Sequence, residues 1–166
     1  MIIMLGWETE QKSNYVWSTY ILCYGSDHSL KKYNYNVGYG TVDDKTVLDE
    51  KDDVAHVKLG GTWRMPTDAE WTELRENCTW TWTVQNGVNG KLCTSKNNGN
   101  SIFIPAAGHR GGIDLLGKGY QATYWSSSLD MDYPGSALLF GYYETSDVYR
   151  TSYPRSAGHS IRPVTE

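Results

Sequence analysis

The sequence predicts an α+β fold in which two helices precede a series of short, mostly antiparallel strands, with long loops between the elements. Three observations support this prediction. Residues 7–60 are rich in polar, aromatic and turn-forming residues, helical patterns end near residue 77, and the apolar residues after that point recur in short runs separated by glycines. We find no internal repeat and no linker, so residues 1–166 are expected to form a single domain.

The first third of the chain is predicted to consist of long loops with one or two strands. Turn-forming residues cluster at 25–27, 38–40 and 43–44, which leaves little room for regular structure. Only short runs such as Tyr15–Leu22 have the composition of a strand in this part.

Two helices are predicted after these loops. The first is short and is expected at Val54–Leu59, because two aspartates precede it and two glycines end it. The second begins after Thr67, whose hydroxyl can cap the helix, and Glu70 stands three residues later, where its carboxylate completes a capping box. Its apolar residues recur at helical spacing, and it is expected to end near Asn77.

Short strands are predicted for the remainder of the chain, where threonine, tryptophan and other strand-forming residues come in short runs. Tight turns are expected at Asn86-Gly87 and Asn89-Gly90, and residues 108–119 are expected to form a glycine-rich loop. The candidate strands are Thr79–Thr83, Gly90–Thr94, Ser101–Pro105, Tyr124–Ser128, Ala137–Phe140 and Ser160–Val164.

The composition limits the kinds of partner that this chain is expected to have. The net charge is −4, so nothing indicates binding to a nucleic-acid backbone. The chain contains 13 Tyr and 7 Trp but only 2 Phe. Tyrosine and tryptophan are enriched at binding surfaces, although they can also replace phenylalanine in a core, which we expect for most of the tryptophans.

Neither a signal peptide nor a membrane span is predicted. Met1–Leu5 is apolar, but it lacks a positively charged start and is too short for either kind of segment.

The three cysteines, Cys23, Cys78 and Cys93, do not form a metal-binding pattern. No pair has the spacing Cys-x-x-Cys, and an odd number excludes complete internal pairing. One disulfide between Cys78 and Cys93 and three free thiols remain the alternatives.

The four histidines, His28, His56, His109 and His159, are scattered and lack the spacing of a zinc site. We expect His56 and His159 to be buried hydrogen-bonding residues. Arg110, in the glycine-rich loop, is a candidate for the border of a binding surface. Because no nucleophile motif occurs either, we predict no metal centre, no cofactor and no enzymatic activity.

Seven blocks of the sequence resemble a known family. Gly61–Trp71 reads Gly-Thr-Trp-Arg-Met-Pro-Thr-Asp-Ala-Glu-Trp and resembles a signature of bacterial C-type-lectin-fold domains. The other six blocks are Gly6–Glu10, Thr79–Trp82, Gln85–Gly90, Asn100–Gly108, Tyr124–Ser128 and Gly158–Val164. Together they resemble the Fibrobacter succinogenes major paralogous domain almost from end to end, which implies a C-type-lectin-like fold.

The resemblance also implies that the first and last strands pair with each other. Members of the family usually carry an extra strand before the block at Gly6–Glu10, and they more often read Trp-Gly where this chain reads Gly-Trp. Met1–Leu5 is therefore the candidate for the first strand, and a truncated reading frame is the alternative.

Two activities of C-type-lectin-fold proteins are not expected. Sulfatase-modifying relatives need paired cysteines near the C-terminus, whereas all three cysteines lie within the first 93 residues. Sugar-binding C-type lectins coordinate calcium through carboxylate motifs, the last of which is Trp-Asn-Asp, but Trp125 is followed by three serines. A structural cation at Asp43-Asp44 or Asp52-Asp53 remains open.

The segment at about 126–160 uses a restricted set of residues. It contains no Lys, Gln, Trp or Asn, and only Met131 and Glu144 lie outside the set reached when the adenines of an Asn codon are randomised. Variable proteins of diversity-generating retroelements show this bias in a C-terminal block and are similar in fold. Ordinary members of the family have Tyr- and Ser-rich stretches here too, so diversified and non-diversified surfaces are both possible interpretations.

Both interpretations place ligand binding on the same surface, where tyrosine offers contact area and a hydroxyl group. Scaffold positions are expected at Trp125, Ala137, Leu139, Phe140, Arg162 and Pro163. Exposed ligand-binding positions are expected at Asp130, Asp132, Tyr133, Gly135, Leu138, Tyr142, Tyr143, Tyr149, Thr151, Ser152, Tyr153 and Ser156.

The sequence therefore predicts a ligand-binding protein of the receptor or adhesin kind, with a diversified C-terminal surface and a protein or glycan as its partner. We expect it on a cell or phage surface or in secreted form. The alternatives are a non-diversified adhesin domain, a structural subunit, and an enzyme related to the formylglycine-generating group.

Overall fold

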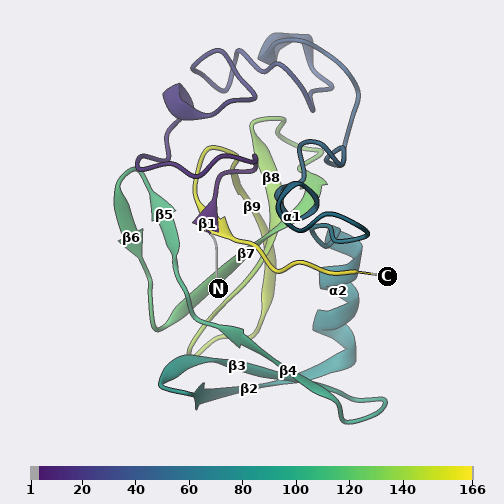
Figure 1. Cartoon of the computed structure of the whole chain (residues 1–166), viewed down its shortest axis with the longest axis vertical. Coiled ribbons are helices and arrows are strands. Elements are labelled where there is room, and N and C mark those ends of the chain that lie inside the picture. The colour runs from purple at the N-terminus through teal and green to yellow at the C-terminus, as the bar shows by residue number, and fades with distance from the viewer. Residues whose placement is uncertain (1–3, 166) are drawn as a thin grey trace.

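The computed structural model describes residues 4–165 and has an α+β fold, made mostly of strands, with two α-helices (Figure 1). Its largest sheet has the strand order β1, β10, β7, β8, β9. Neighbouring strands run antiparallel, except that β10 and β7 are parallel. The strands are β1 (Met4–Leu5), β10 (His159–Ser160), β7 (Gln121–Leu129), β8 (Ser136–Tyr143) and β9 (Tyr149–Pro154).

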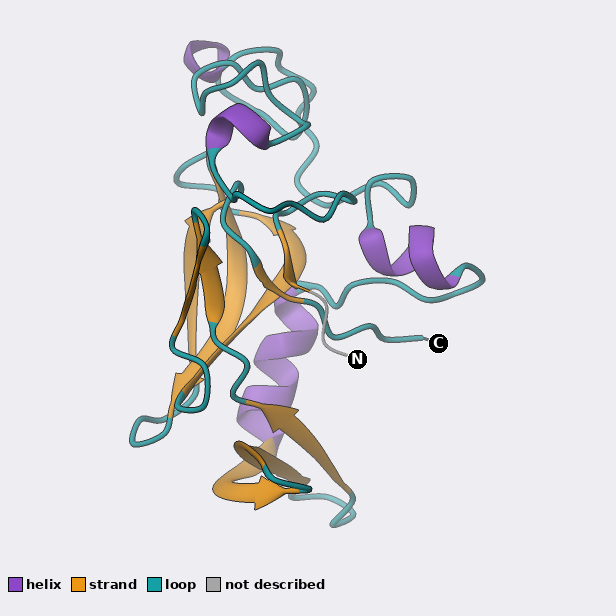
Figure 2. Cartoon of the chain, turned by 60° about the vertical axis from the view of Figure 1, so that its left-hand side comes forward, coloured by secondary structure: helices purple, strands orange, loops and turns teal. Residues whose placement is uncertain are grey.

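One face of this sheet packs against helix α2 (Asp68–Asn77), and a smaller antiparallel sheet lies at one end of the helix (Figure 2). Trp71 of α2 stacks on Phe140 of β8 with ring centroids 4.6 Å apart, and Tyr124 and Tyr142 belong to the same core. The small sheet consists of β2 (Cys78–Gln85), β3 (Val88–Ser95) and β4 (Ser101–Pro105).

The opposite face of the large sheet contributes to a second core, beneath the N-terminal loops at the top of Figure 1. Trp125 and Leu139 of the sheet pack there with Trp7 and Tyr33 of the loops. The short helices in this part are η1 (Trp17–Thr19), η2 (Val37–Tyr39) and α1 (Val54–Leu59).

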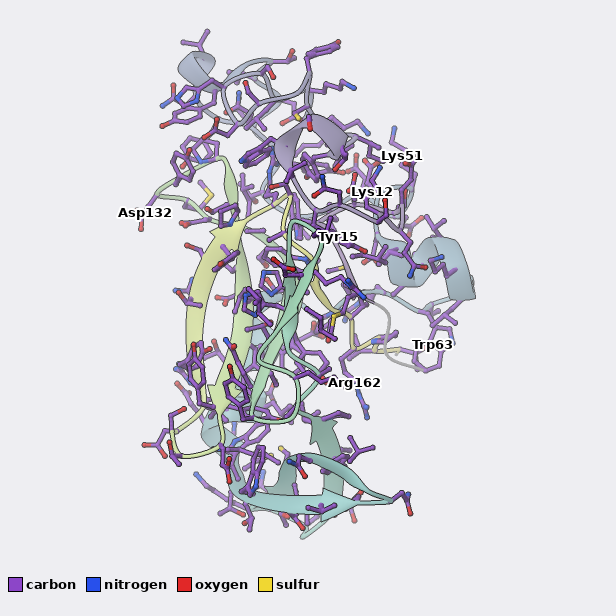
Figure 3. All side chains as sticks on the ribbon, turned by 90° about the vertical axis from the view of Figure 1, so that its left-hand side faces the viewer. Lys12, Tyr15, Lys51, Trp63, Asp132 and Arg162 are labelled. Carbon is purple, nitrogen blue, oxygen red and sulfur yellow. The ribbon has the colours of Figure 1, made fainter. Side chains whose placement is uncertain are left out.

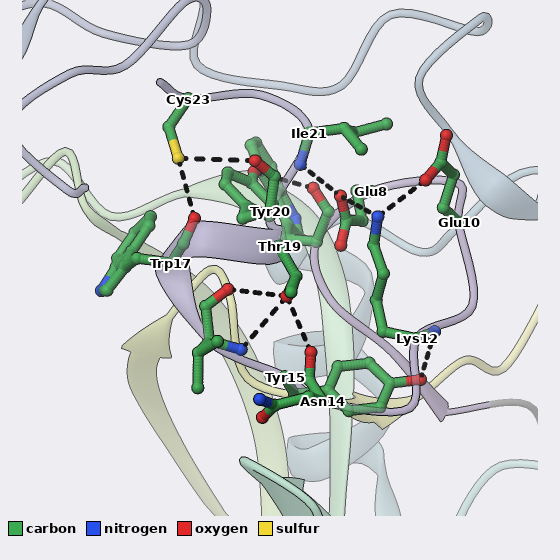
Figure 4. A network of polar contacts seen from close by, with 12 residues as sticks. Glu8, Glu10, Lys12, Asn14, Tyr15, Trp17, Thr19, Tyr20, Ile21 and Cys23 are labelled. Atoms are coloured by element: carbon green, nitrogen blue, oxygen red, sulfur yellow. Dashed lines mark hydrogen bonds and ion pairs between the residues drawn. The ribbon is translucent and has the colours of Figure 1, made fainter. Parts of the chain in front are cut away.

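Polar contacts fix the N-terminal loops, which have little regular secondary structure (Figure 4). Oε2 of Glu8 accepts a hydrogen bond from the N–H of Ile21 at 2.7 Å and lies 3.9 Å from Nζ of Lys12. Burial raises the pKa of Glu8 to about 7. The hydroxyl of Thr19 donates to the carbonyl of Asn14 at 2.7 Å.

A hairpin stands beside the large sheet and reaches the N-terminal loops. Gly108, at its start, forms a parallel bridge with Ala122 of β7. At its turn, the N–H of Tyr15 donates to the carbonyl of Gly112 at 2.9 Å (Figure 3). The two strands are β5 (His109–Gly111) and β6 (Asp114–Leu116).

Both predicted helices are confirmed, together with their caps. Oδ1 of Asp53 accepts from the N–H of Ala55 at 2.8 Å at the start of α1. At the start of α2, the hydroxyl of Thr67 accepts from the N–H of Glu70 at 3.3 Å, and Oε2 of Glu70 accepts from the N–H of Thr67 at 2.8 Å. Helix α2 ends at Asn77, as expected.

The turn between β2 and β3 is confirmed at Asn86-Gly87, where both residues have positive φ angles of 50° and 77°. The turn expected at Asn89-Gly90 is wrong. These residues lie inside β3 and pair with Val84 and Thr83 of β2, because the preceding two-residue turn fixes the register.

Three other element predictions need correction. Residues 108–119 contain the β5–β6 hairpin and are not simply a loop. The last strand is only His159–Ser160, because Val164 bridges Arg64 outside the large sheet. Tyr15–Leu22 contains η1, and the Thr19 hydroxyl holds this turn by donating to nearby carbonyls. Strand β9 was not predicted.

Met4–Leu5 pairs with β10, so the expected pairing of the first and last strands is confirmed; Met1–Ile3 lie outside the described residues. All three thiols, of Cys23, Cys78 and Cys93, are buried and free. No helix within residues 4–165 is long and apolar enough to cross a membrane.

Candidate functional site

A groove of about 530 Å³ lies on the face of the large sheet that is turned away from α2. Strands β7, β8 and β9 form its base, and β5 and β10 contribute a histidine each. It is lined by His109, Gln121, Thr123, Leu139, Tyr143, Tyr149, Arg150, Thr151, Ser152, Tyr153 and His159.

The strand register explains why these side chains converge. Gln121 pairs with Tyr143, and Gly141 pairs with both Thr123 and Tyr149. Residues that pair across strands point to the same face, and side chains alternate along each strand. The alternate residues of β9 that follow Tyr149 therefore face the groove as well.

A tyrosine pair forms one wall of the groove. The rings of Tyr143 and Tyr149 stack with centroids 5.9 Å apart, and Nε2 of Gln121 donates to the hydroxyl of Tyr143 at 3.1 Å. Burial raises the pKa of Tyr149. A Cβ at Gly141 would lie 2.9 Å from the Tyr149 ring, so glycine is needed for this ring to lie over β8.

Two imidazoles meet inside the groove. His109 of β5 and His159 of β10 stack with centroids 5.5 Å apart. The ring of Tyr153 lies roughly perpendicular to both, at 5.8 and 4.9 Å. Burial lowers the pKa of each histidine, and the neighbouring His109 lowers that of His159 further. Both rings are therefore neutral near pH 7.

The hydrogen bonds of His159 leave one nitrogen open. Its Nδ1 lies 2.7 Å from Oγ1 of Thr123, and that hydroxyl donates to the carbonyl of Gly108 at 3.4 Å. Its Nε2 is buried and has no hydrogen-bond partner in the described part of the chain. Nδ1 of His109 is buried without a partner in the same way.

The groove carries almost no charge. Nε of Arg150 donates to both carboxylate oxygens of Asp68 on α2, at 2.7 and 2.8 Å, so its charge is already paired. Among the described residues, the lining includes no Asp, Glu, Lys or Cys.

Five of the twelve predicted ligand-binding residues line the groove. They are Tyr143, Tyr149, Thr151, Ser152 and Tyr153. The sequence placed them in one segment, and the structure places them around one concave surface.

Most of the other predicted residues lie near the connection between β7 and β8, where Asp132 is exposed (Figure 3). The hydroxyl of Tyr133 donates to the carboxylate of Asp27, and its ring meets that of Tyr39 edge-on at 5.2 Å. Asp27 and Tyr39 belong to the N-terminal loops, so the sequence did not predict them as neighbours of Tyr133. The predicted residues in this region are Asp130, Asp132, Tyr133 and Gly135, and Ser156 follows Arg155, whose N–H donates to the carbonyl of Gly135 at 3.0 Å.

Five predicted positions are buried, and their expected exposure is wrong. These are Asp130, Gly135, Leu138, Tyr142 and Ser156. On β8, Leu138 and Tyr142 share the face of Phe140, which packs against α2. The Tyr142 hydroxyl donates to the carbonyl of Ile104 and accepts from the N–H of Lys91 at 3.2 Å, so this tyrosine belongs to the core.

The predicted scaffold is largely confirmed, since Trp125, Ala137, Leu139 and Phe140 are buried, whereas Arg162 and Pro163 are half-buried. His159 is buried and hydrogen-bonded, as expected.

The prediction for His56 is wrong, because this residue is half-exposed, 3.9 Å from Glu50. Arg110 lines a different hollow, between β6 and β3, rather than the groove.

Three groove residues, His109, Gln121 and Thr123, were not predicted from the sequence. His109 was assigned to a loop, and the strand that contains the other two was expected to begin only at Tyr124. Gln121, Thr123 and Trp125 lie two residues apart, and this strand-like spacing could have predicted a start of the strand at Gln121.

Within residues 4–165, no group of three or more His, Cys, Asp or Glu side chains is arranged to hold a metal ion. Comparisons of the chain with protein-family models, with curated proteins and with solved structures find no match.

Proposed function

We propose that this protein binds a ligand in the tyrosine-lined groove and does not catalyse a reaction. The observation that carries this proposal is the groove itself, a concave surface with exposed tyrosine rings and a few inward-facing polar groups. Tyr143 is 43% exposed and Tyr153 is 40% exposed, so both offer ring surface to a ligand.

The polar groups of the groove favour binding over catalysis. Thr123 and His159 resemble a nucleophile and a base, but Thr123 is buried. A nucleophile must reach the substrate and give its proton to the base. Among residues 4–165, the lining also offers no carboxylate and no thiol.

Binding can be tested with a triple variant, Tyr149→Ala, Thr151→Ala and Tyr153→Ala. Labelled protein is first screened on arrays of glycans and of surface proteins, and affinity is then measured for each hit. We expect the triple variant to lose at least tenfold in affinity, because exposed aromatic residues contribute most to such contacts.

The control is Tyr24→Ala, which removes a tyrosine that is 77% exposed and lies outside the groove. It should leave affinity unchanged, and both variants should keep the wild-type far-UV circular dichroism. Equal affinities of the triple variant and the wild type for every hit would contradict the proposal.

We also propose a C-type-lectin-like fold for the chain and membership of the Fibrobacter succinogenes major paralogous domain. The pairing of β1 with β10 supports this assignment, as does the Trp-Arg-Met-Pro-Thr segment before α2. An experimental structure in which these two strands do not pair would contradict it.

Display on a cell or phage surface, or secretion, fits a groove for an external ligand, and labelling of intact cells would test it.

The finer proposal is that segment 126–160 is diversified by a retroelement. Its restricted residue set supports this, and Tyr143, Tyr149, Thr151, Ser152 and Tyr153 of that segment line the groove. Sequencing of close isolates should show substitutions concentrated at codons whose template copies carry adenine. Identical segments in all isolates would contradict diversification and would support the alternative, a binding domain that is not diversified.

A further inference from the structure

A second concave surface lies between α1 and the C-terminal segment on one side and the small sheet on the other (Figure 2). It consists of three hollows that share lining residues. Leu59 lines the first and second hollows, Lys58 the first and third, and Pro105 the second and third. The hollows therefore form one continuous cleft. Among the described residues, this cleft and the tyrosine-lined groove have no lining residue in common.

The charged residues that line this cleft are all positive, and we call it the basic cleft. They are Lys58 of α1, Arg110 of β5, Lys118 after β6, and Arg162 after β10. Within residues 4–165, none of the four forms an ion pair, and the lining contains no Asp or Glu. The whole chain has a net charge of −4, so this excess of positive charge is local. A cleft lined by charges of one sign attracts ligands of the opposite sign.

Apolar side chains are exposed in the same cleft. Trp63 is 39% exposed and Leu59 is 54% exposed. A backbone bridge holds Trp63 beside the segment that carries Arg162, because the N–H of Arg64 donates to the carbonyl of Val164 at 3.0 Å (Figure 3). Tryptophan and arginine are the residue types that contribute most often to binding hot spots, so a ligand of this cleft is expected to have both acidic and apolar groups.

Strand β4 borders the basic cleft and is an edge strand of the small sheet. Phe103 and Pro105 of this strand line the cleft. Beyond its pairing with β3, Phe103 makes no backbone hydrogen bond within residues 4–165. An edge strand presents N–H and C=O groups with which an extended peptide can pair.

We propose that the basic cleft binds an acidic peptide segment of a partner protein in extended form. Carboxylates of the peptide would face the four cations, and its apolar side chains would pack against Trp63 and Leu59. This interaction uses a different surface from the tyrosine-lined groove and does not depend on the proposed function.

The cleft favours a peptide over a polyanion such as a nucleic acid or a sulfated polysaccharide. Charge complementarity requires an acidic partner in either case. A polyanion would use the cations, but it would leave the backbone groups at the edge of β4 without partners. An acidic peptide with apolar residues satisfies the cations, the exposed apolar side chains and the strand edge together.

The probe is a set of fluorescent decapeptides in which Asp or Glu alternates with Leu or Trp, so that an extended chain has one acidic face and one apolar face. One matched set replaces the acidic residues by Lys, and another replaces the apolar residues by Gly. Affinity is measured by fluorescence anisotropy. We expect members of the acidic set to bind with a Kd below about 1 mM, and both matched sets to bind at least about tenfold more weakly.

Two double variants with the same change in net charge test the location. Lys58→Glu with Arg162→Glu reverses two charges of the cleft, and Lys51→Glu with Lys96→Glu reverses two exposed charges outside it. The first should lower the affinity for the acidic set at least about tenfold. The second should stay within about threefold of the wild type, because salt screens exposed charges that lie away from the peptide. Far-UV circular dichroism shows whether each variant folds.

A measurement on the wild-type protein keeps the test valid if either variant fails to fold. The tightest acidic peptide is titrated into ¹⁵N-labelled protein and followed by NMR. The indole N–H resonance of Trp63 and the backbone amide resonance of Phe103 should shift, while the amides of Thr151 and Tyr153 in the groove should not. The triple groove variant should bind this peptide as tightly as the wild type.

Four other outcomes would overturn the proposal. Heparin or DNA that binds as tightly as the acidic peptides would identify a site for polyanions. Equal losses in the two double variants would show that only net charge matters. Self-association of the chain that the cleft variant abolishes would identify a second copy as the occupant. If no acidic peptide binds, the cleft is not a peptide site, whereas the proposed function is tested on the groove and is unaffected.

Discussion

Tyr142 and Tyr143 are neighbours in β8 but have opposite environments. Tyr142 is fully buried and its hydroxyl bonds to Ile104 and Lys91, whereas Tyr143 is exposed at the groove and stacks on Tyr149. Side chains alternate along a strand, so adjacent residues of a sheet that is covered on one face must differ in this way.

This difference predicts opposite effects of the same substitution. Tyr142→Ala should lower the free energy of unfolding by about 3–5 kcal/mol, because it leaves a large cavity in the core. Tyr143→Ala should cost about 1 kcal/mol or less and should reduce ligand binding instead. Urea denaturation measures both, and similar losses of stability in the two variants would contradict the assigned environments.

At the same scale, the sequence identified the groove residues of β9 but could not separate them from buried ones. Tyr149, Thr151 and Tyr153 lie two residues apart and share a face. Their residue types indicated a binding surface, yet Tyr142 has the same residue type and is in the core. Residue type alone does not reveal the face, because the face is set by strand pairing.

At the scale of elements, local signals were decisive for the helices and for one hairpin. The caps at Asp53 and Thr67 satisfy backbone N–H groups within three residues, so they could be predicted from the sequence. Asn86-Gly87 carries the positive φ angles of a two-residue turn. Each of these signals depends only on residues close together in the chain.

The hairpin β5–β6 depends on contacts that the sequence does not reveal. Gly108 has a φ angle of 77°, and a Cβ there would lie 2.2 Å from the carbonyl oxygen of Leu116. Glycine is therefore needed at position 108 because two backbone segments approach closely there, and not because the segment is a flexible loop. The hairpin places His109 in the groove. Because these residues were predicted to form a loop, His109 was not predicted as a site residue.

At the scale of the whole molecule, the N-terminal loops are held to the sheet by buried polar groups. Arg155 follows β9 and is fully buried, with its guanidinium over the rings of Trp7 and Tyr20. Its Nη1 donates to the carbonyls of Lys32 and Tyr33 at 3.3 and 3.2 Å. Glu8 lies in the same part and bonds to Ile21.

The buried Glu8 predicts a pH dependence of stability. Its pKa is raised from 4.5 to about 7, so between these values the folded state binds more protons than the unfolded state. Its contribution to stability must therefore fall as the pH rises from 4.5 to 7. Relative to Glu8→Gln, the wild type should lose on the order of 3 kcal/mol between pH 4 and pH 8.

Denaturation of both proteins at several pH values measures this difference. The lowered pKa values of His109 and His159 predict that protonation of these two residues destabilises the fold below about pH 6.5. Both proteins contain these histidines, so this effect cancels in the comparison. A difference that stays constant or rises with pH would show that Glu8 is ionised without penalty.

The sequence by itself determined the α+β class, both helices with their caps, and the segment that supplies the tyrosines. These features depend on neighbouring residues and on composition. Only the tertiary structure decided that His109 and His159, fifty positions apart, meet beside Thr123, where one ring nitrogen of each is buried without a hydrogen-bond partner among residues 4–165. Strand order and register bring such residues together, and they result from the packing of the whole chain.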